Sequence, residues 1–311
     1  MGKTAILFPG QGSQSVGMGQ TAFQADERAR QCFEKADDIL GYSLSRLCFE
    51  GPEEELRLTA NAQPAILTTS VALFRMFQDA DIRPDFVAGH SLGEYSALVA
   101  AEALSFEEAV LTVHRRGLYM EEAVPAGQGA MSAVIGLDRE QVDAVCREAS
   151  TEEQSVEPAN YNCPGQLVIS GHAEAVKRAG EEAQEAGARR VIPLSVSGPF
   201  HSRLMRPAAE RLESALNEVT IRDAAVPVVA NVTGQAVQSA EEIRRLLVKQ
   251  VVSPVLWEDS IRWMLDQGVD TFVEIGPGNV LTGLVRRIER RAKAVSIQDP
   301  ASLEKGLDSL Q

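Results

Sequence analysis

The pattern of apolar and polar positions along the chain predicts strands that alternate with helices. Short apolar runs bounded by glycine, proline or charged residues predict buried strands at 4–8, 85–89, 226–232, 270–276 and 293–297. Apolar residues at helical spacing predict helices at 62–80, 105–122, 202–218, 257–267 and 279–290, with another that starts at Ser239. Alternating strands and helices are typical of a mostly parallel sheet covered by helices on both faces.

The middle of the chain follows a different pattern. Strands are predicted at 130–137, 156–161, 166–171 and 189–196, with helices at 138–149 and 173–187. This β-α-β-β-α-β order is that of a small ferredoxin-like module. We therefore expect a ferredoxin-like subdomain at 127–198, inserted into a large α/β domain formed by 1–126 and 199–311.

Composition and charge exclude several classes of protein. The 311 residues are 44% hydrophobic and 24% charged, which is ordinary for a soluble globular protein. A net charge of -14 argues against nucleic acid, which requires a basic face. No apolar run is long enough to span a membrane, and the start lacks a signal-peptide core. We expect a cytoplasmic protein that does not bind membranes.

The cysteines do not indicate a metal site. Cys32, Cys48, Cys146 and Cys163 are scattered, and no His/Cys cluster has the spacing of metal ligands. We interpret them as reduced, structural thiols and expect no bound metal.

The stretch GHSLGEYSAL contains a candidate nucleophile. Residues 89–93 fit the pattern G-x-S-x-G, with an apolar strand before them and a helix-like run after them. In α/β-hydrolase-like folds this pattern places a serine on a sharp turn between strand and helix, and we expect the large domain to be α/β-hydrolase-like. Ser91 is therefore either a nucleophile or an ordinary cap of the following helix.

A nucleophilic serine needs nearby backbone amides that stabilise an oxyanion. The N–H of Leu92, directly after the serine, is suited to this role because it lies at a helix N-terminus. The loop FPGQGSQ is placed to offer a second donor, the N–H of Gln11. The alternative is a phosphate-binding loop, although the Lys-Ser/Thr ending of a P-loop is absent.

A serine also needs a base, and the chain has four histidines. His90 adjoins the serine and is expected to point to the other side of the turn. His114 lies within a helix and His172 opens one. His201, in the Gly-Pro break SGPFHS, is left by elimination as the base. No third carboxylate is evident, so a backbone carbonyl is the expected partner of the histidine.

Six stretches together resemble the malonyl-CoA:acyl carrier protein transacylases and the acyltransferase domains of polyketide synthases. They are FPGQGSQ, GHSLGEYSAL, MEEAVPAGQGAM, NCPGQLVISG, GPFHS and EIGPG, and they occur in the family's order. The resemblance implies that Ser91 accepts malonyl from coenzyme A as an ester and passes it to the phosphopantetheine thiol of acyl carrier protein in a ping-pong reaction. It implies no cofactor, since coenzyme A is a substrate carrier.

The resemblance also implies roles for further residues. Arg116 matches the arginine that holds the malonyl carboxylate, although Arg115 is an equal candidate on sequence alone. Gln250 matches the residue whose carbonyl orients the histidine. Gln63 and Asn162 match polar residues that line the pocket. Phe200 matches a phenylalanine that accompanies malonyl over methylmalonyl preference.

Partner binding is expected to involve local basic patches. Arg190 follows Arg189 in the predicted insert, and Arg287 lies in a basic run near the end of the chain. They are either a docking surface for coenzyme A or carrier protein, or ordinary solvated charges. Competing functions are polyketide-type loading of a carrier protein and a serine thioesterase. We expect a monomer.

Overall fold

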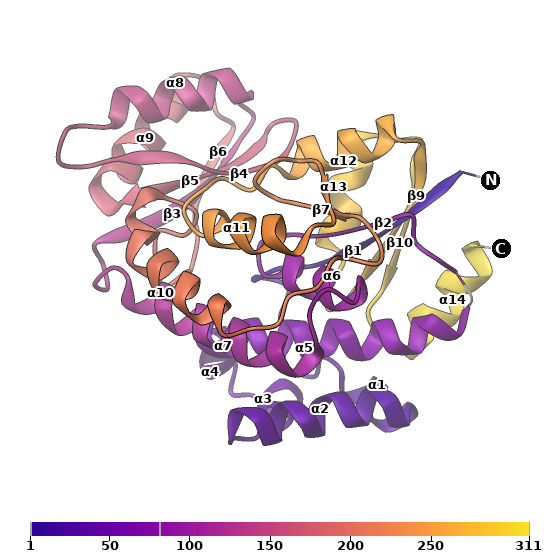
Figure 1. The fold of residues 1–311 in the computed structure, drawn as a ribbon. Helices are drawn as coiled ribbons and strands as arrows, with labels where there is room; N and C mark the ends of the chain where they lie inside the picture. The colour runs from indigo at the N-terminus through magenta and orange to yellow at the C-terminus, as the bar shows by residue number, and fades with distance from the viewer. Residues whose placement is uncertain (1, 81, 311) are drawn as a thin grey trace.

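A computed structural model describes residues 2–80 and 82–310, and its centre is a six-stranded sheet (Figure 1). The strands are β1 (Lys3–Phe8), β2 (Phe86–Gly89), β7 (Val228–Val229), β8 (Ala236–Val237), β9 (Val269–Ile275) and β10 (Lys293–Ile297). They lie in the order β10-β9-β1-β2-β7-β8, and every neighbouring pair is parallel except β7 with β8. The predicted mostly parallel sheet is confirmed.

Alternate residues of β1 face two separate hydrophobic cores. Ile6 and Phe8 pack in a core with helices of one face, and Ala5 and Leu7 pack in a second core with Trp257 and its neighbours. The first face is covered by α5 (Thr59–Phe77), α6 (Gly93–Ala100), α7 (Phe106–Glu122), α10 (Arg206–Asn217) and α11 (Ala240–Gln250). The second is covered by α12 (Trp257–Asp266) and α13 (Val280–Ile288). This two-sided burial explains the continuous apolar runs of the strands.

A second, antiparallel sheet lies within 127–198. Its strands are β3 (Gly129–Ile135), β4 (Val156–Cys163), β5 (Gln166–His172) and β6 (Arg190–Pro193), in the order β4-β5-β3-β6. Helices α8 (Arg139–Ala149) and α9 (Ala173–Glu185) supply the rest of its own core. The strand order and the β-α-β-β-α-β sequence are ferredoxin-like, as predicted.

Some elements were not predicted from the hydrophobic pattern. Helices α1 (Gln20–Ala25), α2 (Glu27–Leu40), α3 (Leu44–Glu50) and α4 (Glu53–Arg57) form an outer layer against α5, and α14 (Pro300–Leu310) packs on β10 (Figure 1). The strand expected at 226–232 is only two residues long. It ends early because the backbone N–H of Ala230 donates to the carbonyl of Gln235 in a turn. The backbone N–H of Asn231 donates to the Glu94 carboxylate on α6.

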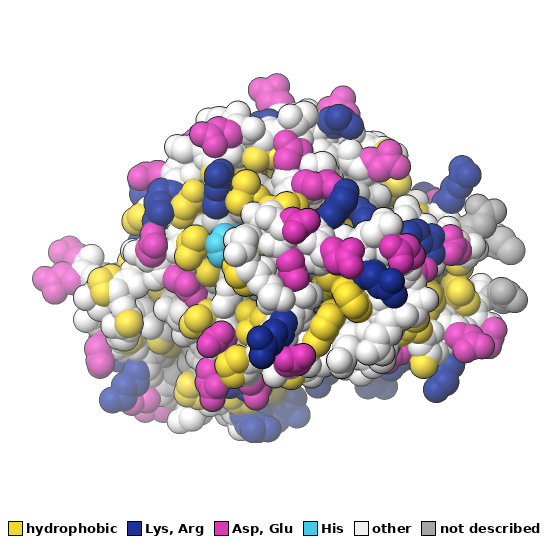
Figure 2. All heavy atoms as spheres, turned by 90° about the horizontal axis from the view of Figure 1, so that it is seen from below, with side chains coloured by type: hydrophobic (Ala, Val, Ile, Leu, Met, Phe, Trp, Pro, Cys, Tyr) yellow, Lys and Arg dark blue, Asp and Glu magenta, His cyan; other side chains and the backbone are white. Residues whose placement is uncertain are grey.

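The charges on the surface and the burial of the cysteines are those expected from the composition. Acidic and basic side chains are interspersed over the face seen in Figure 2. Cys32, Cys48, Cys146 and Cys163 are free and buried. Within the described ranges, no helix has the length and apolar character needed to cross a membrane.

Candidate active site

Ser91 lies on a strained turn between β2 and α6. Its φ of 50° is in the left-handed region, which non-glycine residues adopt at a cost of about 1–3 kcal/mol. Gly93 allows the tight approach to β1, because a Cβ there would lie 2.1 Å from the carbonyl oxygen of Phe8. The Ser91 side chain makes no cap bond to α6. The structure therefore excludes the helix-cap interpretation.

The side chain of Asn231 holds the strained turn by two hydrogen bonds. The sequence did not predict this residue. Asn231 Oδ1 accepts from the backbone N–H of Ser91 at 2.7 Å, and its Nδ2 donates to the carbonyl of Gly89 at 2.7 Å. Asn231 follows β7, so the parallel pairing of β2 with β7 brings it to the elbow. Its place directly after the short run VPVVA was the signal available in the sequence.

His201 contacts the serine as predicted by elimination. Its Nε2 lies 2.8 Å from Ser91 Oγ, and its Nδ1 lies 2.9 Å from the carbonyl oxygen of Gln250. With Nδ1–H donating to that carbonyl, Nε2 is free to accept the serine proton. Burial, together with the nearby Arg116 cation, lowers the pKa of His201 to about 3. The imidazole is therefore neutral, as a general base must be.

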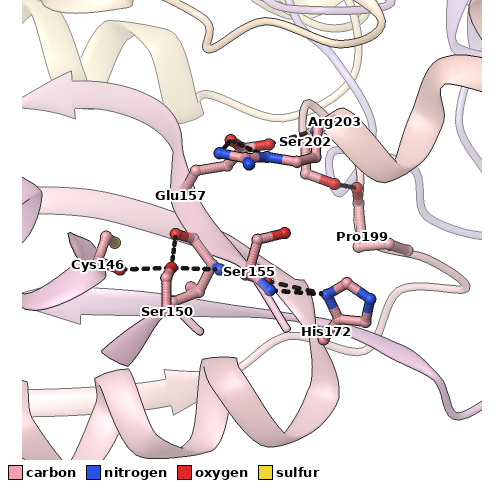
Figure 3. Close-up of polar contacts among 9 residues, drawn as sticks. Cys146, Ser150, Ser155, Glu157, His172, Pro199, Ser202 and Arg203 are labelled. Carbon is pink, nitrogen blue, oxygen red and sulfur yellow. Dashed lines mark hydrogen bonds and ion pairs between the residues drawn. The ribbon is translucent and has the colours of Figure 1, made fainter. Parts of the chain in front are cut away.

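The turn that carries His201 is bound to the antiparallel sheet (Figure 3). His201 itself has a φ of 59°. The Ser202 hydroxyl donates to the carbonyl of Pro199 at 2.6 Å, which closes the turn. The Glu157 carboxylate on β4 accepts from the backbone N–H of Arg203 and from its side chain at 3.1 and 3.2 Å. The small sheet is thus hydrogen-bonded to the chain two residues after His201.

The other histidines have structural partners. His114 bonds the carbonyl of Ala60 at 2.8 Å, and His172 accepts from the backbone N–H of Ser155 at 2.9 Å (Figure 3). His90 also borders the cleft, but its ring lies against Trp257 and not against Ser91, in agreement with the expectation that it points to the other side of the turn. Its Nε2 bonds Asn162 Oδ1 at 2.8 Å, which commits that nitrogen to a structural contact.

Arg116 is a buried cation beside the serine. It is 1% exposed, and its Nη2 lies 3.2 Å from Ser91 Oγ. Its other bonds go to the neutral amides Gln63, at 2.8 Å, and Gln250, at 2.9 Å, while Nε has no partner among the described residues. Arg115 instead reaches Glu218 at 3.6 Å with its side chain 38% exposed. Burying a guanidinium among neutral groups is costly unless an anion joins it.

Gln250 links the parts of the site. Its backbone carbonyl accepts from His201, and its side-chain oxygen accepts from Arg116. Its Nε2 donates to Glu94 Oε2 at 2.9 Å and to the carbonyl of Ser91 at 3.1 Å. One glutamine at the end of α11 therefore fixes base, cation and nucleophile relative to each other. The resemblance pointed to its carbonyl, and the side-chain contacts emerge only from the fold.

Two backbone amides are available beside the serine. Among the described residues, the N–H groups of Gln11 and Leu92 have no hydrogen-bond acceptor, and both residues line the cleft. Gly10 permits the loop after β1 to approach, since a Cβ there would lie 2.3 Å from the carbonyl oxygen of His90. Free N–H groups on two loops are the arrangement that stabilises an oxyanion.

The cleft lies between the two sheets and has a volume of about 390 Å³. Ser91, His201, Arg116 and Phe200 line it on the side of the six-stranded sheet, and residues of β3, β4 and the segment after β6 line it from the other side. Gln63 and Asn162 are not among the residues that border the cleft, and their predicted contact with substrate stays a prediction. They lie behind it and hold lining residues: Gln63 holds Arg116 and Asn162 holds His90.

The two predicted docking arginines share a separate groove of about 480 Å³. Arg189 and Arg190 enter it from the small sheet, and Arg286, Arg287 and Arg290 from α13 and the turn after it. Two basic runs about 100 residues apart in sequence therefore meet at one place, in a chain that is acidic overall. Arg287 also bonds Gln166.

The site meets the requirements of acyl transfer through a serine. It combines a strained serine, a neutral imidazole oriented by a carbonyl, and two free amides in one cleft. In the part of the chain described here, no group of His, Cys, Asp or Glu side chains has the arrangement of a metal site. The class defined by this fold and cleft is an α/β acyltransferase.

Comparison with known proteins gives the family. Residues 6–302 match the family described as Acyl transferase domain, so the chain belongs to the acyl transferase family. It is 52% identical, over all of its length and 98% of the relative, to the malonyl CoA-acyl carrier protein transacylase of Bacillus subtilis (strain 168). It is 42% identical to the solved malonyl CoA-acyl carrier protein transacylase of Coxiella burnetii, with a TM-score of 0.97 and coverage of 99% and 98%.

Another similar structure contains a partner. It is a malonyl-transacylase solved in complex with its type II PKS acyl-carrier protein. The chain is 47% identical to it, with a TM-score of 0.96 and coverage of 99% of each chain. The resemblance stated from the sequence motifs is therefore confirmed at the level of the family.

Proposed function

We propose that this enzyme transfers a malonyl group from malonyl-CoA to the phosphopantetheine thiol of an acyl carrier protein, for chain elongation in fatty-acid synthesis. The family and the names of the similar transacylases support the substrate pair. The observation that carries the proposal for this chain is Arg116. A buried guanidinium whose side-chain hydrogen bonds go to neutral amides, 3.2 Å from the serine oxygen, suits an acyl group that ends in a carboxylate.

In the first half-reaction, Ser91 Oγ attacks the thioester carbonyl of malonyl-CoA. His201 Nε2 takes the serine proton, and the developing oxyanion accepts hydrogen bonds from the amides of Gln11 and Leu92. The carbon–sulfur bond breaks and the imidazolium returns its proton to the thiolate, so coenzyme A leaves as the thiol. The malonyl group remains as an ester on Ser91, with its carboxylate on Arg116.

In the second half-reaction, the phosphopantetheine thiol enters the same cleft. His201 takes the thiol proton, sulfur attacks the ester carbonyl, and the carbon–oxygen bond to Ser91 breaks with return of the proton to Oγ. No resident cofactor or metal is required, since each step moves only a proton and an acyl group. We propose a cytoplasmic location for this reaction.

The subdomain and the arginine groove form part of the proposal. We propose that 127–198 is a discrete subdomain on the large domain of 1–126 and 199–311. It would close one wall of the cleft, with Phe200 restricting branched acyl groups. Arg190 and Arg287, in their shared groove, would receive the phosphates of coenzyme A or the acidic surface of the carrier protein.

The test follows the acyl group. The protein is mixed with malonyl-CoA labelled in the malonyl group, and protease mapping locates the label before carrier protein is added. The expected label lies on the peptide containing Ser91 and moves to added holo-carrier protein, while Ser91→Ala and His201→Ala acquire none. Rapid release of free malonate without an acceptor would instead support a thioesterase. A label that transfers only to a polyketide carrier protein would support polyketide-type loading.

A further inference from the structure

A buried carboxyl group that the proposed reaction does not use lies behind the site. Glu94 is 3% exposed and sits in the first turn of α6. Its Oε2 accepts from the backbone N–H of Asn231 at 3.0 Å and from Gln250 Nε2 at 2.9 Å. The oxygen of the same Gln250 amide accepts from Arg116 Nη2. One side-chain amide therefore separates Glu94 from the cation that faces the serine.

The charged and titratable groups around Glu94 are few. Arg116 faces it from α7, and Tyr95 is its neighbour on α6. From the segment after β7 and from α11 the neighbours are the neutral amides of Asn231 and Gln250. His201 is neutral. Glu53 and Arg57, which also border the cleft, pair with each other and add no net charge. The net charge behind the serine is thus set by Arg116 and Glu94, until a substrate adds a second carboxylate.

We propose that Glu94 is a positioning residue that acts as the counter-charge of Arg116, and that it takes up a proton from solvent when the substrate's carboxylate binds Arg116. This inference rests on the proposed function. With Glu94 ionised, the empty site is neutral, and an incoming carboxylate leaves it with an excess negative charge. With Glu94 protonated, the empty site is cationic, and the same carboxylate neutralises it.

The proton is available near neutral pH. Burial, against the opposing effect of its hydrogen bonds and of Arg116, raises the pKa of Glu94 to about 7. A bound carboxylate favours the protonated form further. By reciprocity, protonation of Glu94 tightens carboxylate binding by the same factor, so binding weakens as the pH rises through the pKa of Glu94.

The direct test counts protons. Malonyl-pantetheine, which lacks the titrating phosphates of coenzyme A, is titrated calorimetrically into the Ser91→Ala protein near pH 7 in buffers of different ionisation enthalpy. The expected result is uptake of roughly half a proton per ligand, because Glu94 is about half protonated at that pH. Adding Glu94→Gln should abolish the uptake, whereas adding Glu185→Gln, an exposed carboxyl group on α9, should leave it unchanged.

A kinetic test uses the active enzyme. The KM for malonyl-pantetheine is expected to rise by up to about tenfold between pH 6 and pH 8 in the parent and in Glu185→Gln, and to stay low and flat in Glu94→Gln. Glutamine preserves the acceptor for Asn231 and Gln250 but cannot ionise. A purely structural role would shift kcat or stability in Glu94→Gln and leave the pH dependence of KM as in the parent.

The outcomes separate this inference from the proposed function. Malonyl-pantetheine that binds without proton uptake overturns the role of Glu94 and leaves malonyl transfer intact. A ligand that neither binds nor labels Ser91 overturns the proposed function itself. Should Glu94→Gln fail to fold, a proton count of zero on the Ser91→Ala protein still overturns the inference, because that measurement requires no change at Glu94.

Discussion

A base that is buried next to a cation stays unprotonated far below the usual range of histidine. His201 is 4% exposed, and both its burial and Arg116 lower its pKa, to about 3. A group with a depressed folded pKa is charged only below that value, so the neutral imidazole persists through mildly acidic solution. The proximity of base and cation therefore widens the pH range in which His201 is neutral and can activate Ser91.

The first prediction concerns this range. The pH dependence of kcat/KM for acylation of Ser91 should show no acidic limb near pH 6.5, and activity should persist to about pH 5. The measurement is the single-turnover rate of malonyl transfer to Ser91, extrapolated to low substrate concentration across that range. A fall in rate centred on the ordinary pKa of histidine would show that His201 titrates normally.

The second prediction concerns the cation. Arg116→Ala should lower kcat/KM for malonyl transfer by about 100-fold or more, because a desolvated charged contact is worth roughly 2–5 kcal/mol. Arg116→Lys should recover only a small part, since an ammonium cannot hold Gln63 and Gln250 and grip a carboxylate with two parallel bonds. Arg115→Ala is the matched control and should be near the parent. Equal losses in the two alanine variants would contradict the assignment.

Individual residues differ in how far the sequence defines them. Ser91 stands out because the flanking glycines and the preceding strand are those of a sharp turn that exposes a serine. His201 stands out because the chain has only four histidines to choose from. Arg115 and Arg116 are equivalent in sequence, and only the packing of α7 against α5 decides which is buried. Asn231 and Glu94 are missed because their role depends on contacts to residues more than 130 positions away.

At the scale of elements, strand β4 forms hydrogen bonds with two segments that carry site residues, one after His201 and one after Gln250. The backbone of Ala159 and Tyr161 bonds Val255, a few residues after Gln250, and Glu157 holds Arg203, two residues after His201 (Figure 3). The base and the carbonyl that orients it are thus tied to one strand of the small sheet. An ordinary surface ion pair contributes little, but this carboxylate also accepts a backbone N–H in a strained turn.

The third prediction concerns the contact of Glu157 on β4 with Arg203. Glu157→Gln should lower kcat by about three- to tenfold with little change in KM, because the His201 turn loosens while the carboxylate site on Arg116 is untouched. Glu153→Gln, an exposed change in the loop before β4, is the control. Steady-state kinetics measures both. An unchanged kcat in Glu157→Gln would show that the turn is held by Ser202 and Pro199 alone.

Elements with a clear pattern of apolar residues could be predicted from the sequence. Elements that depend on contacts with other helices could not. The runs 4–8, 270–276 and 293–297 became β1, β9 and β10 because both of their faces are buried. The helices of residues 20–57 are short and cover α5 from outside, so their assignment depends on tertiary contacts. The strand expected at 226–232 is shortened because Asn231 bonds the serine turn.

At the scale of the molecule, the arrangement of the two sheets produces two features that no single segment contains. The cleft takes its serine, base and cation from the side of the six-stranded sheet and its opposite wall from β3, β4 and the segment after β6. The arginine groove takes its cations from β6 and from α13 with the turn after it. β3 reaches both places, with Met131 at the cleft and Ile135 at the groove, and β4 borders the cleft at Asn160 while the turn after it borders the groove at Gly165.

This geometry suits a long flexible carrier. Four residues of β-strand span about 13 Å, so the groove lies roughly a strand's length from the cleft. A phosphopantetheine arm that enters the cleft must be attached to something that rests outside it. Five arginines at that distance offer an anionic partner a local attraction, despite the chain's net charge of -14.

The fourth prediction tests this docking surface. Arg190→Glu and Arg287→Glu should each raise the KM for carrier protein by about tenfold and leave kcat within about twofold, because they weaken encounter and not the chemistry. Added salt should raise the parent's KM toward that of the variants, since exposed charges are screened within a Debye length of about 10 Å at 0.1 M. Arg30→Glu, a change at a half-buried arginine on α2, is the control. If Arg190→Glu and Arg287→Glu keep the parent's KM at low salt, the arginine groove is only solvated charge, and carrier protein approaches the cleft from another side.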